Sequence, residues 1–202
     1  MMRILVACEY SGRVREAFRS LGHDAWSCDI LPSDDQSKNH IISDVLPLLG
    51  NGWDMMVAFP PCTYLCSSGL HWNNRVKGRS QKTEEALEFV RALMKSPIEK
   101  IAIENPVGRI GTAIRKADQS IHPYMFGDDA SKRTCLWLKG LGKLRPTKFV
   151  DPRMVNGKPR WGNQTDSGQN RLPPSDNRWK ERSKTYQGIA LAMADQWGAS
   201  DG

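Results

Sequence analysis

The chain has 202 residues, enough for one large domain with a hydrophobic core, or for one domain with a small appendage, which we expect. Its formal charge of +7 predicts a soluble protein. Such a charge suits binding to an anionic molecule such as nucleic acid, but a basic protein without such a partner is the alternative. No apolar run approaches the ~20 residues of a membrane span, and the first residues lack the apolar segment of a signal peptide. We therefore expect a cytoplasmic protein.

The cysteines argue against a disulfide framework, because they are five in number and lack framework spacing. Cys62 and Cys66 with His71 nearby suggest a metal site, but no second ligand pair follows at zinc-site spacing. We predict reduced thiols and no bound metal.

Apolar runs typical of strands alternate with helical patterns from the first residues onward. Residues 2–7 predict a strand, and the apolar positions from Val14 to Leu21 predict a helix that Gly22 ends. Thr83 is expected to cap a helix whose apolar face runs from Ala86 to Met94. Further strands are predicted at 24–30, 40–45, 53–59 and 100–105.

This alternation predicts an α/β fold with a doubly wound, mostly parallel sheet. Residues 120–127 and 133–141 flank a turn-like stretch and predict an antiparallel hairpin at one edge of the sheet. Ligands of such sheets lie at the carboxyl ends of the strands. Asp29, Asp44 and Glu104 are all predicted at such ends.

The composition changes after about residue 145, which suggests three parts. Residues 1–144 form the predicted α/β domain, and residues 183–202 a closing helix that returns to it. Residues 145–182 are basic, rich in Pro, Gly and Asn, and include Trp161 and Trp179. That mixture suits phosphate contacts and base stacking, although a surface insertion is an equally simple interpretation.

A thiol follows two consecutive prolines where a buried strand is predicted to end. Pro60 and Pro61 stop the strand and stiffen the next turn, so Cys62 is presented at the carboxyl edge. This position favours a nucleophile over a packing role, but with no nearby histidine as base both interpretations stay open. Glu104 ends a neighbouring strand and either caps a loop or partners the thiol. A thiolate that attacks a ring carbon and an acid that hydrogen-bonds the ring nitrogen form a coherent pair.

The stretches "FPPC" and "IENP" resemble, in order and separation, the Pro-Cys and Glu-Asn motifs of the cytosine-5 DNA methyltransferases. The similarity is greatest to the small versions from bacteriophages and prophages. It implies a Rossmann-like fold that uses S-adenosylmethionine, in the cytoplasm of a bacterial or phage-infected cell. Residues 1–144 would then be the catalytic and cofactor-binding domain, and residues 145–182 a small segment like a target-recognition domain. By this resemblance Cys62 adds to carbon 6 of cytosine, Glu104 contacts ring nitrogen 3, and Asn105 holds the Pro-Cys loop. Arg133 would polarise the base carbonyl, with Lys132 as the alternative.

The resemblance also covers the cofactor site. "ACEYSG" stands where the family has a glycine-rich loop, although it retains only Gly12, and "CDI" stands where Asp29 holds the ribose and Ile30 lies against adenine. Asp44 would read the adenine amino group. The cofactor contacts implied are Cys8, Glu9, Ser11, Gly12, Asp29, Ile30, Asp44, Val45, Phe59 and Pro61.

Double-stranded DNA is the partner that the resemblance implies. The expected DNA contacts are Lys132, Arg160, Trp161, Arg171 and Arg178. Because residues 145–182 are much shorter than the family's target-recognition domain, three alternatives stay open: a very short target, broad cytosine modification, or a protein partner for recognition.

Two other functions also stay open. One is the same chemistry on RNA or a related carbon 5 modification; the other is an inactive nucleic-acid-binding protein. A dinucleotide-dependent dehydrogenase is disfavoured because "CEYSGR" lacks the three-glycine fingerprint.

Overall fold

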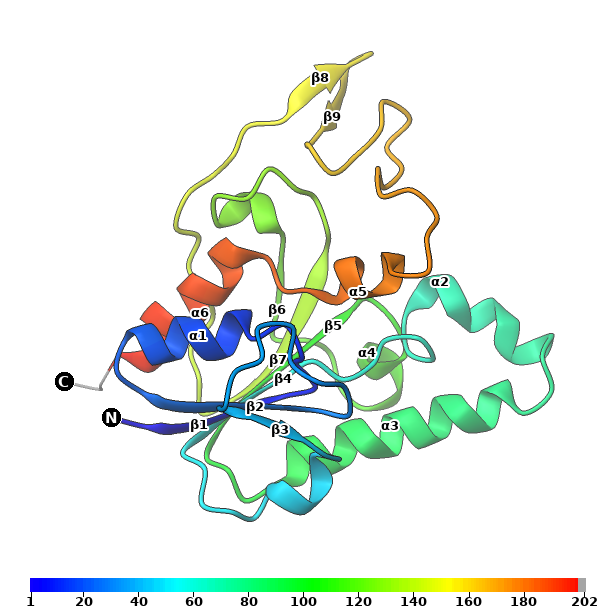
Figure 1. The fold of residues 1–202 in the computed structure, drawn as a ribbon. Helices are drawn as coiled ribbons and strands as arrows, with labels where there is room; N and C mark the ends of the chain where they lie inside the picture. Colours follow the sequence, from blue (N-terminus) through cyan, green and yellow to red (C-terminus); the bar gives the residue numbers. More distant parts are fainter. Residues whose placement is uncertain (200–202) are drawn as a thin grey trace.

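A computed structural model describes residues 1–199, which form a seven-stranded sheet flanked by helices and a separate two-stranded sheet (Figure 1). The strands are β1 Arg3–Ala7, β2 Asp24–Asp29, β3 His40–Ile42, β4 Met55–Ala58, β5 Lys100–Pro106, β6 Gln119–Ile121, β7 Thr134–Lys139, β8 Arg153–Val155 and β9 Lys158–Arg160. The α-helices are α1 Arg13–Ser20, α2 Ser67–Leu70, α3 Arg79–Lys95, α4 Arg109–Ala113, α5 Arg178–Ser183 and α6 Gln187–Gly198. Short 3-10 helices are η1 Leu46–Leu48, η2 His71–Asn74 and η3 Pro123–Met125.

The large sheet has the strand order β3-β2-β1-β4-β5-β7-β6. β1, β2, β3, β4 and β5 pair in parallel, whereas β7 runs antiparallel to both of its neighbours, β5 and β6. The α/β fold, the mostly parallel sheet and the antiparallel edge are thus confirmed. The order of β3, β2, β1, β4 and β5 is that of a doubly wound sheet, and β7 lies between β5 and the edge strand β6. The strand order reverses between β1 and β4, so a ligand is expected at the carboxyl ends of these two strands.

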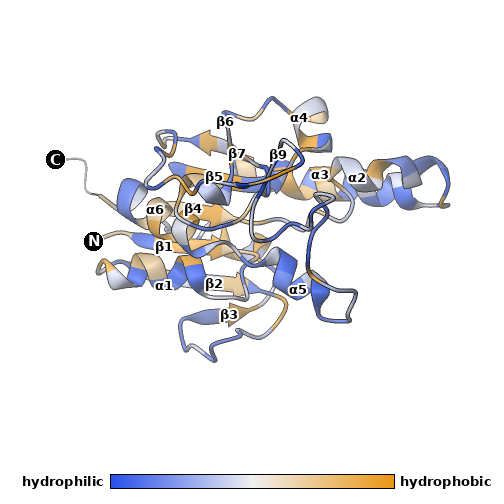
Figure 2. Ribbon diagram, turned by 90° about the horizontal axis from the view of Figure 1, so that it is seen from above, coloured by the Kyte–Doolittle hydropathy of each residue, from blue (hydrophilic) through white to orange (hydrophobic). Residues whose placement is uncertain are grey.

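Both faces of the sheet are covered, which explains why the central strands read as continuous apolar runs. β4 is buried along its whole length. One face packs against α1 and α6, through Phe18, Met193 and Trp197, and the other packs against α3, through Leu87 and Leu93. Figure 1 shows the strands between α1 and α6 on one side and α3 on the other, and Figure 2 shows that the strands at the centre are apolar.

α3 begins earlier than the sequence predicts. Gly78, in the left-handed conformation at φ 78°, precedes its first residue, so Thr83 lies inside the helix and the prediction that Thr83 caps it was wrong. The Thr83 side chain is buried, and its hydroxyl donates to the Tyr64 carbonyl at 3.1 Å. This threonine therefore anchors the segment after Cys62 to α3.

Residues 145–182 contain more regular structure than expected. β8 and β9 form a hairpin around Asn156 and Gly157, both at positive φ, as in the tight turns that Asn-Gly favours. The hairpin projects away from the large sheet at the top of Figure 1. The closing helix was expected from residue 183, but α5 ends there and α6 begins at Gln187. Residues 200–202 of that expected helix lie outside the described part.

Within residues 1–199, no helix combines the length and the apolar character that crossing a bilayer requires.

Candidate active site

The thiol lies in a compact turn just after β4. The amides of Leu65 and Cys66 both donate to the Cys62 carbonyl, at 3.0 and 2.9 Å, and the Cys62 side chain is exposed. The end of this turn is fixed to the chain that follows β5, because the Arg109 amide donates to the Leu65 carbonyl at 2.7 Å. A Cβ on Gly108 would lie 2.0 Å from that same carbonyl oxygen, so only glycine permits this approach.

Asn105 connects β5 to the proline pair. Its side chain is 1% exposed, and its Nδ2 donates to the Pro60 carbonyl at 2.7 Å. Its Oδ1 is buried without a hydrogen-bond partner. Because proline cannot donate a backbone hydrogen bond, Pro60 is held through its carbonyl instead. This is the contact expected of Asn105.

Glu104 and Cys62 lie at the carboxyl ends of adjacent parallel strands. Although the Cys62 side chain reaches solvent, the protein around its sulfur raises the pKa of the thiol above its ordinary value, and the charges of Cys66 and Glu104 raise this pKa further. The Lys132 ammonium acts in the opposite direction. Thiol, carboxylate and ammonium are therefore close enough to influence one another.

Lys132 and Arg133 point to different surroundings. Lys132 Nζ donates to the Arg182 carbonyl of α5 at 3.0 Å and also acts on Cys62. The Arg133 side chain is exposed, and its Nη2 contacts the hydroxyl of Ser120 on β6 at 3.5 Å. The charge of Lys132 therefore acts on the thiol, whereas Arg133 contacts the edge strand β6.

Sequence reasoning missed Thr134, the first residue of β7. Its side chain is 3% exposed, and its hydroxyl donates to Glu104 Oε1. The sequence offered no signal for this contact, because it depends on the pairing register of β5 and β7.

Three of the expected cofactor residues gather at the ends of β1, β2 and β3. Burial raises the pKa of the Cys8 thiol, and the charges of Asp29 and Asp44 add to the rise, so all three side chains are neighbours. Ile30, directly after β2, is 76% exposed, and Val45 is buried in the core. Two more of the expected residues follow β4, where Phe59 packs against the core and Pro61 is exposed.

Glu9 caps the helix that follows it in the chain. Its side chain is 4% exposed, and its carboxylate accepts hydrogen bonds from the Val14 amide at 2.8 Å, the Arg15 amide at 3.3 Å and the Ser11 hydroxyl at 3.2 Å. Glu9 therefore fills the amino-terminal end of α1, the position at which phosphates bind in dinucleotide sites. Gly12 precedes α1 at φ 73°, a conformation that glycine adopts readily.

α5 covers the loop between β1 and α1. The Tyr10 hydroxyl donates to the Lys180 carbonyl at 2.6 Å and lies 2.9 Å from the Ser183 hydroxyl. The Arg13 guanidinium donates to the Thr185 carbonyl at 2.8 Å. A segment distant in sequence thus closes over the expected cofactor loop, which the sequence did not predict.

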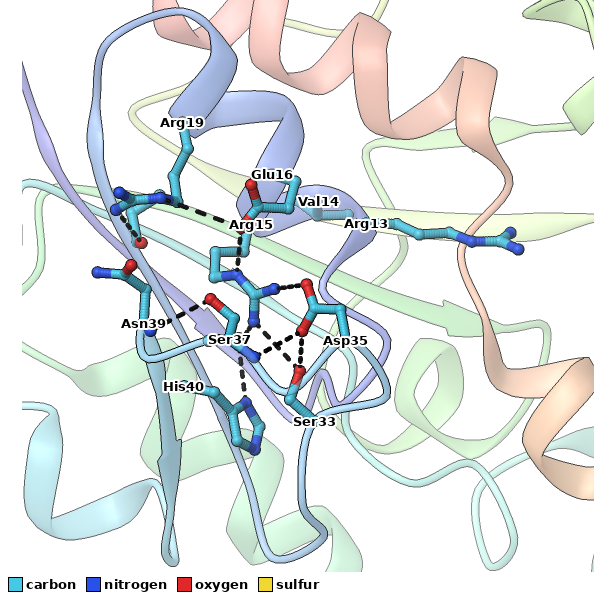
Figure 3. A network of polar contacts seen from close by, with 12 residues as sticks. Arg13, Val14, Arg15, Glu16, Arg19, Ser33, Asp35, Ser37, Asn39 and His40 are labelled. Carbon is cyan, nitrogen blue, oxygen red and sulfur yellow. Dashed lines mark hydrogen bonds and ion pairs between the residues drawn. The ribbon is translucent and has the colours of Figure 1, made fainter.

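A fully buried arginine of α1 is at the centre of a polar network. Arg15 pairs with Asp35 and donates to the Ser27 hydroxyl at 2.7 Å (Figure 3). Burial alone would raise the pKa of Asp35, but hydrogen bonds from Ser33 and the Ser37 amide, together with the Arg15 charge, lower it overall. The network joins α1 to the loop between β2 and β3.

Four of the five expected DNA contacts lie in residues 145–182, and they differ in exposure and in hydrogen bonding. Trp161 stacks on Tyr124 at 4.4 Å between ring centroids, and its Nε1 donates to the Val150 carbonyl, so at least one ring face is covered. Arg160 Nε donates to the Asp166 carbonyl at 3.0 Å, so part of its guanidinium is already hydrogen-bonded within the segment. Arg171 is exposed, and Arg178 begins α5 half-buried.

A polar cavity of about 220 Å³ separates Lys132 from this segment. Asn163, Gln164, Asn170 and Tyr186 are among its lining residues. It offers amide, hydroxyl and cationic groups directly beside the lysine that acts on Cys62.

No protein-family model matches the chain, and no curated protein is significantly similar to it. Within residues 1–199, no three His, Cys, Asp or Glu side chains gather as a metal site would require.

Proposed function

We propose that this chain transfers a methyl group from S-adenosylmethionine to carbon 5 of cytosine in DNA. The observation that carries the proposal is the meeting of Cys62 and Glu104 at adjacent strand ends, with Asn105 fixing the proline turn before the thiol. A nucleophile and an acid at the ligand-binding edge of a doubly wound sheet match the chemistry of addition to a pyrimidine ring.

The cofactor pocket supports a ligand with a nucleoside but without phosphate. Glu9 already occupies the amino-terminal end of α1, so a pyrophosphate would meet a carboxylate there. Asp29, at the end of β2, is where an acid binds ribose in such folds, and the exposed Ile30 beside it offers an apolar surface to a base. These residues fit S-adenosylmethionine better than a dinucleotide.

S-adenosylmethionine supplies an electrophilic methyl group when bound. Cys62, once deprotonated, adds to carbon 6 of the flipped cytosine, and Glu104 hydrogen-bonds ring nitrogen 3 as negative charge develops there. Lys132 favours the thiolate through its charge, a role separate from the contact with the base carbonyl that the resemblance implies for Arg133. After methylation, loss of the carbon 5 proton to a base expels the Cys62 thiolate and restores the ring.

The raised pKa of Cys62 makes substrate binding part of the activation. A flipped base unstacks at a cost of about a few kcal/mol and displaces water from the pocket. Glu104 must carry a proton to donate a hydrogen bond to ring nitrogen 3, so binding of the base together with a proton removes the Glu104 charge, one of the causes that raise the thiol pKa. The free enzyme therefore keeps a protonated, weakly reactive thiol.

The basic late segment supports DNA as the substrate. Arg171 and Arg178 lie in the segment that borders the cavity beside Lys132, and the whole chain carries a formal charge of +7. Cationic side chains neutralise phosphates, so binding is expected to weaken steeply as salt rises.

The test is incubation with tritiated S-adenosylmethionine and unmethylated double-stranded DNA, followed by nucleoside analysis, with Cys62→Ala as the control. The proposal expects 5-methylcytosine only with the intact thiol. A parallel reaction with transfer RNA separates the RNA alternative, since label there and not in DNA would overturn the substrate. DNA binding without any cofactor binding would instead favour an inactive nucleic-acid-binding protein.

A further inference from the structure

We infer that Thr134 is a positioning residue that fixes which oxygen of Glu104 carries the proton during catalysis. The inference rests on the proposed function and adds a residue to it. Its basis is the hydrogen bond from the Thr134 hydroxyl to Glu104 Oε1, between side chains on adjacent antiparallel strands.

The register of β5 and β7 places the two side chains on one face of the sheet. Glu104 pairs with Leu136 and Pro106 pairs with Thr134, so Thr134 lies two residues from the partner of Glu104. Side chains two residues apart share a face, and Leu136 packs in the core beneath α1 and α6. The Glu104 carboxyl is therefore fixed from the side by a short, β-branched residue with few rotamers.

The hydroxyl makes the two carboxyl oxygens of Glu104 inequivalent. Because Oε1 accepts the hydrogen bond from the Thr134 hydroxyl, a proton that Glu104 takes up with the bound base resides on Oε2. When the Cys62 thiolate bonds to carbon 6, the electrons of the ring double bond shift toward nitrogen 3, which takes that proton from Oε2. Glu104 becomes a carboxylate at this moment, and nitrogen 3 returns the proton when the thiolate is expelled.

Thr134 thus stabilises the transition state more than the ground state. Hydrogen bonds to an ionised acceptor are roughly twice as strong as those to a neutral one. The Thr134 bond strengthens as Glu104 gives up its proton, so it contributes to kcat rather than to substrate binding. Burial of Thr134 at 3% exposure keeps water from replacing it.

The test compares Thr134→Val, which keeps the shape and removes the donor, with Thr134→Ser, which keeps the donor. We expect Thr134→Val to lower kcat by about 10–100-fold with little change in KM for DNA or cofactor, and Thr134→Ser to restore most of it. Thr112→Val is the matched control, since Thr112 lies on the exposed surface of α4.

If Thr134→Val does not fold, Thr134→Ser and Thr134→Ala provide the comparison, because both lack the methyl group and only serine has the hydroxyl. Equal kcat in the donor and non-donor variants, or a change confined to KM, would overturn the inference while the proposed function stands. A wild-type protein that forms no 5-methylcytosine would instead overturn the proposed function, and the role of Thr134 with it.

Discussion

Asn105 Nδ2 and the Pro60 carbonyl oxygen, 2.7 Å apart, join β5 to the turn that presents the thiol. The bond links the two strands whose ends carry Glu104 and Cys62. Since the Asn105 side chain is 1% exposed, water does not compete for the Pro60 carbonyl. The position of the nucleophile thus depends on a residue of the neighbouring strand.

Asn105→Ala is therefore expected to lower both stability and activity. A buried Pro60 carbonyl without its donor should lower the free energy of unfolding by about 1–3 kcal/mol. Because the turn that holds Cys62 would then be less well fixed, methyl transfer should fall more than cofactor binding. Urea denaturation and methyl transfer to DNA measure the two effects. Asn177→Ala is the matched control, because Asn177 is exposed and its side chain does not cap α5. Full activity in Asn105→Ala would contradict the role of this bond.

The raised pKa of Cys62 predicts slow alkylation by iodoacetamide near neutral pH, because only the thiolate reacts. Glu104→Gln removes a charge that raises this pKa and should speed alkylation of Cys62, whereas Lys132→Gln removes the opposing charge and should slow it. Rates for the Cys62 peptide, followed by mass spectrometry across pH, test this order. Identical rates in both variants and the wild type would mean that neither group acts on the thiol.

Much of this site follows from local patterns in the sequence. The apolar run before Pro60 predicts β4, and the parallel strands predict that Cys62 and Glu104 end at one edge. Contacts set by register do not follow: a shift of one residue would turn Thr134 to the other face of the sheet. The same limit explains the choice between Lys132 and Arg133, which are adjacent in sequence and point to different surroundings.

Two further contacts were outside the reach of local patterns. Nothing in the sequence of α1 marks Arg15 as buried, since its partner Asp35 lies in a loop 20 residues later. Glu9 resembles a ligand contact in sequence because carboxylates occur in binding loops, yet it bonds the amides of its own helix. Its capping role depends on how the chain turns after β1, where Cys8 adopts a φ of 58°.

The Arg15–Asp35 pair predicts a pH-dependent contribution to stability. The folded pKa of Asp35 is lower than its ordinary value, so the contribution is present above about pH 4, the unfolded pKa, and is lost as pH falls through the folded pKa. Asp35→Asn should cost about 1–2 kcal/mol at neutral pH, less than a fully buried pair, because the Asp35 side chain is 38% exposed. Denaturation of both proteins between pH 7 and pH 3 tests this: the difference should shrink in acid, and a constant difference would contradict it.

Asp29 and Glu9 are expected to separate cofactor binding from stability. Asp29→Asn should weaken S-adenosylmethionine binding by about 10-fold or more, because an acid in this position binds ribose hydroxyls. Glu9→Gln should lower stability by about 0.5–2 kcal/mol, with cofactor affinity retained, because an amide side chain has one acceptor oxygen where both Glu9 carboxyl oxygens accept backbone amides at the end of α1. Calorimetric titration and thermal unfolding measure the two effects. The assignment fails if Glu9→Gln abolishes binding in a protein that unfolds like the wild type.

Lys132 and Arg133 offer a comparison between adjacent cations of equal charge. Lys132→Gln removes the ammonium that favours the Cys62 thiolate, whereas Arg133→Gln changes a group that contacts Ser120 on β6. On DNA containing 5-fluorocytosine, which retains the covalent adduct, Lys132→Gln should form the adduct about 10-fold more slowly or worse, and Arg133→Gln should resemble the wild type. Lys132→Arg should keep most of the rate, because it keeps the charge.

Since Lys132 also bonds the Arg182 carbonyl, loss of the adduct together with loss of cofactor binding would point to displacement of α5 instead. A slower reaction in Arg133→Gln than in Lys132→Gln would return the catalytic role to Arg133.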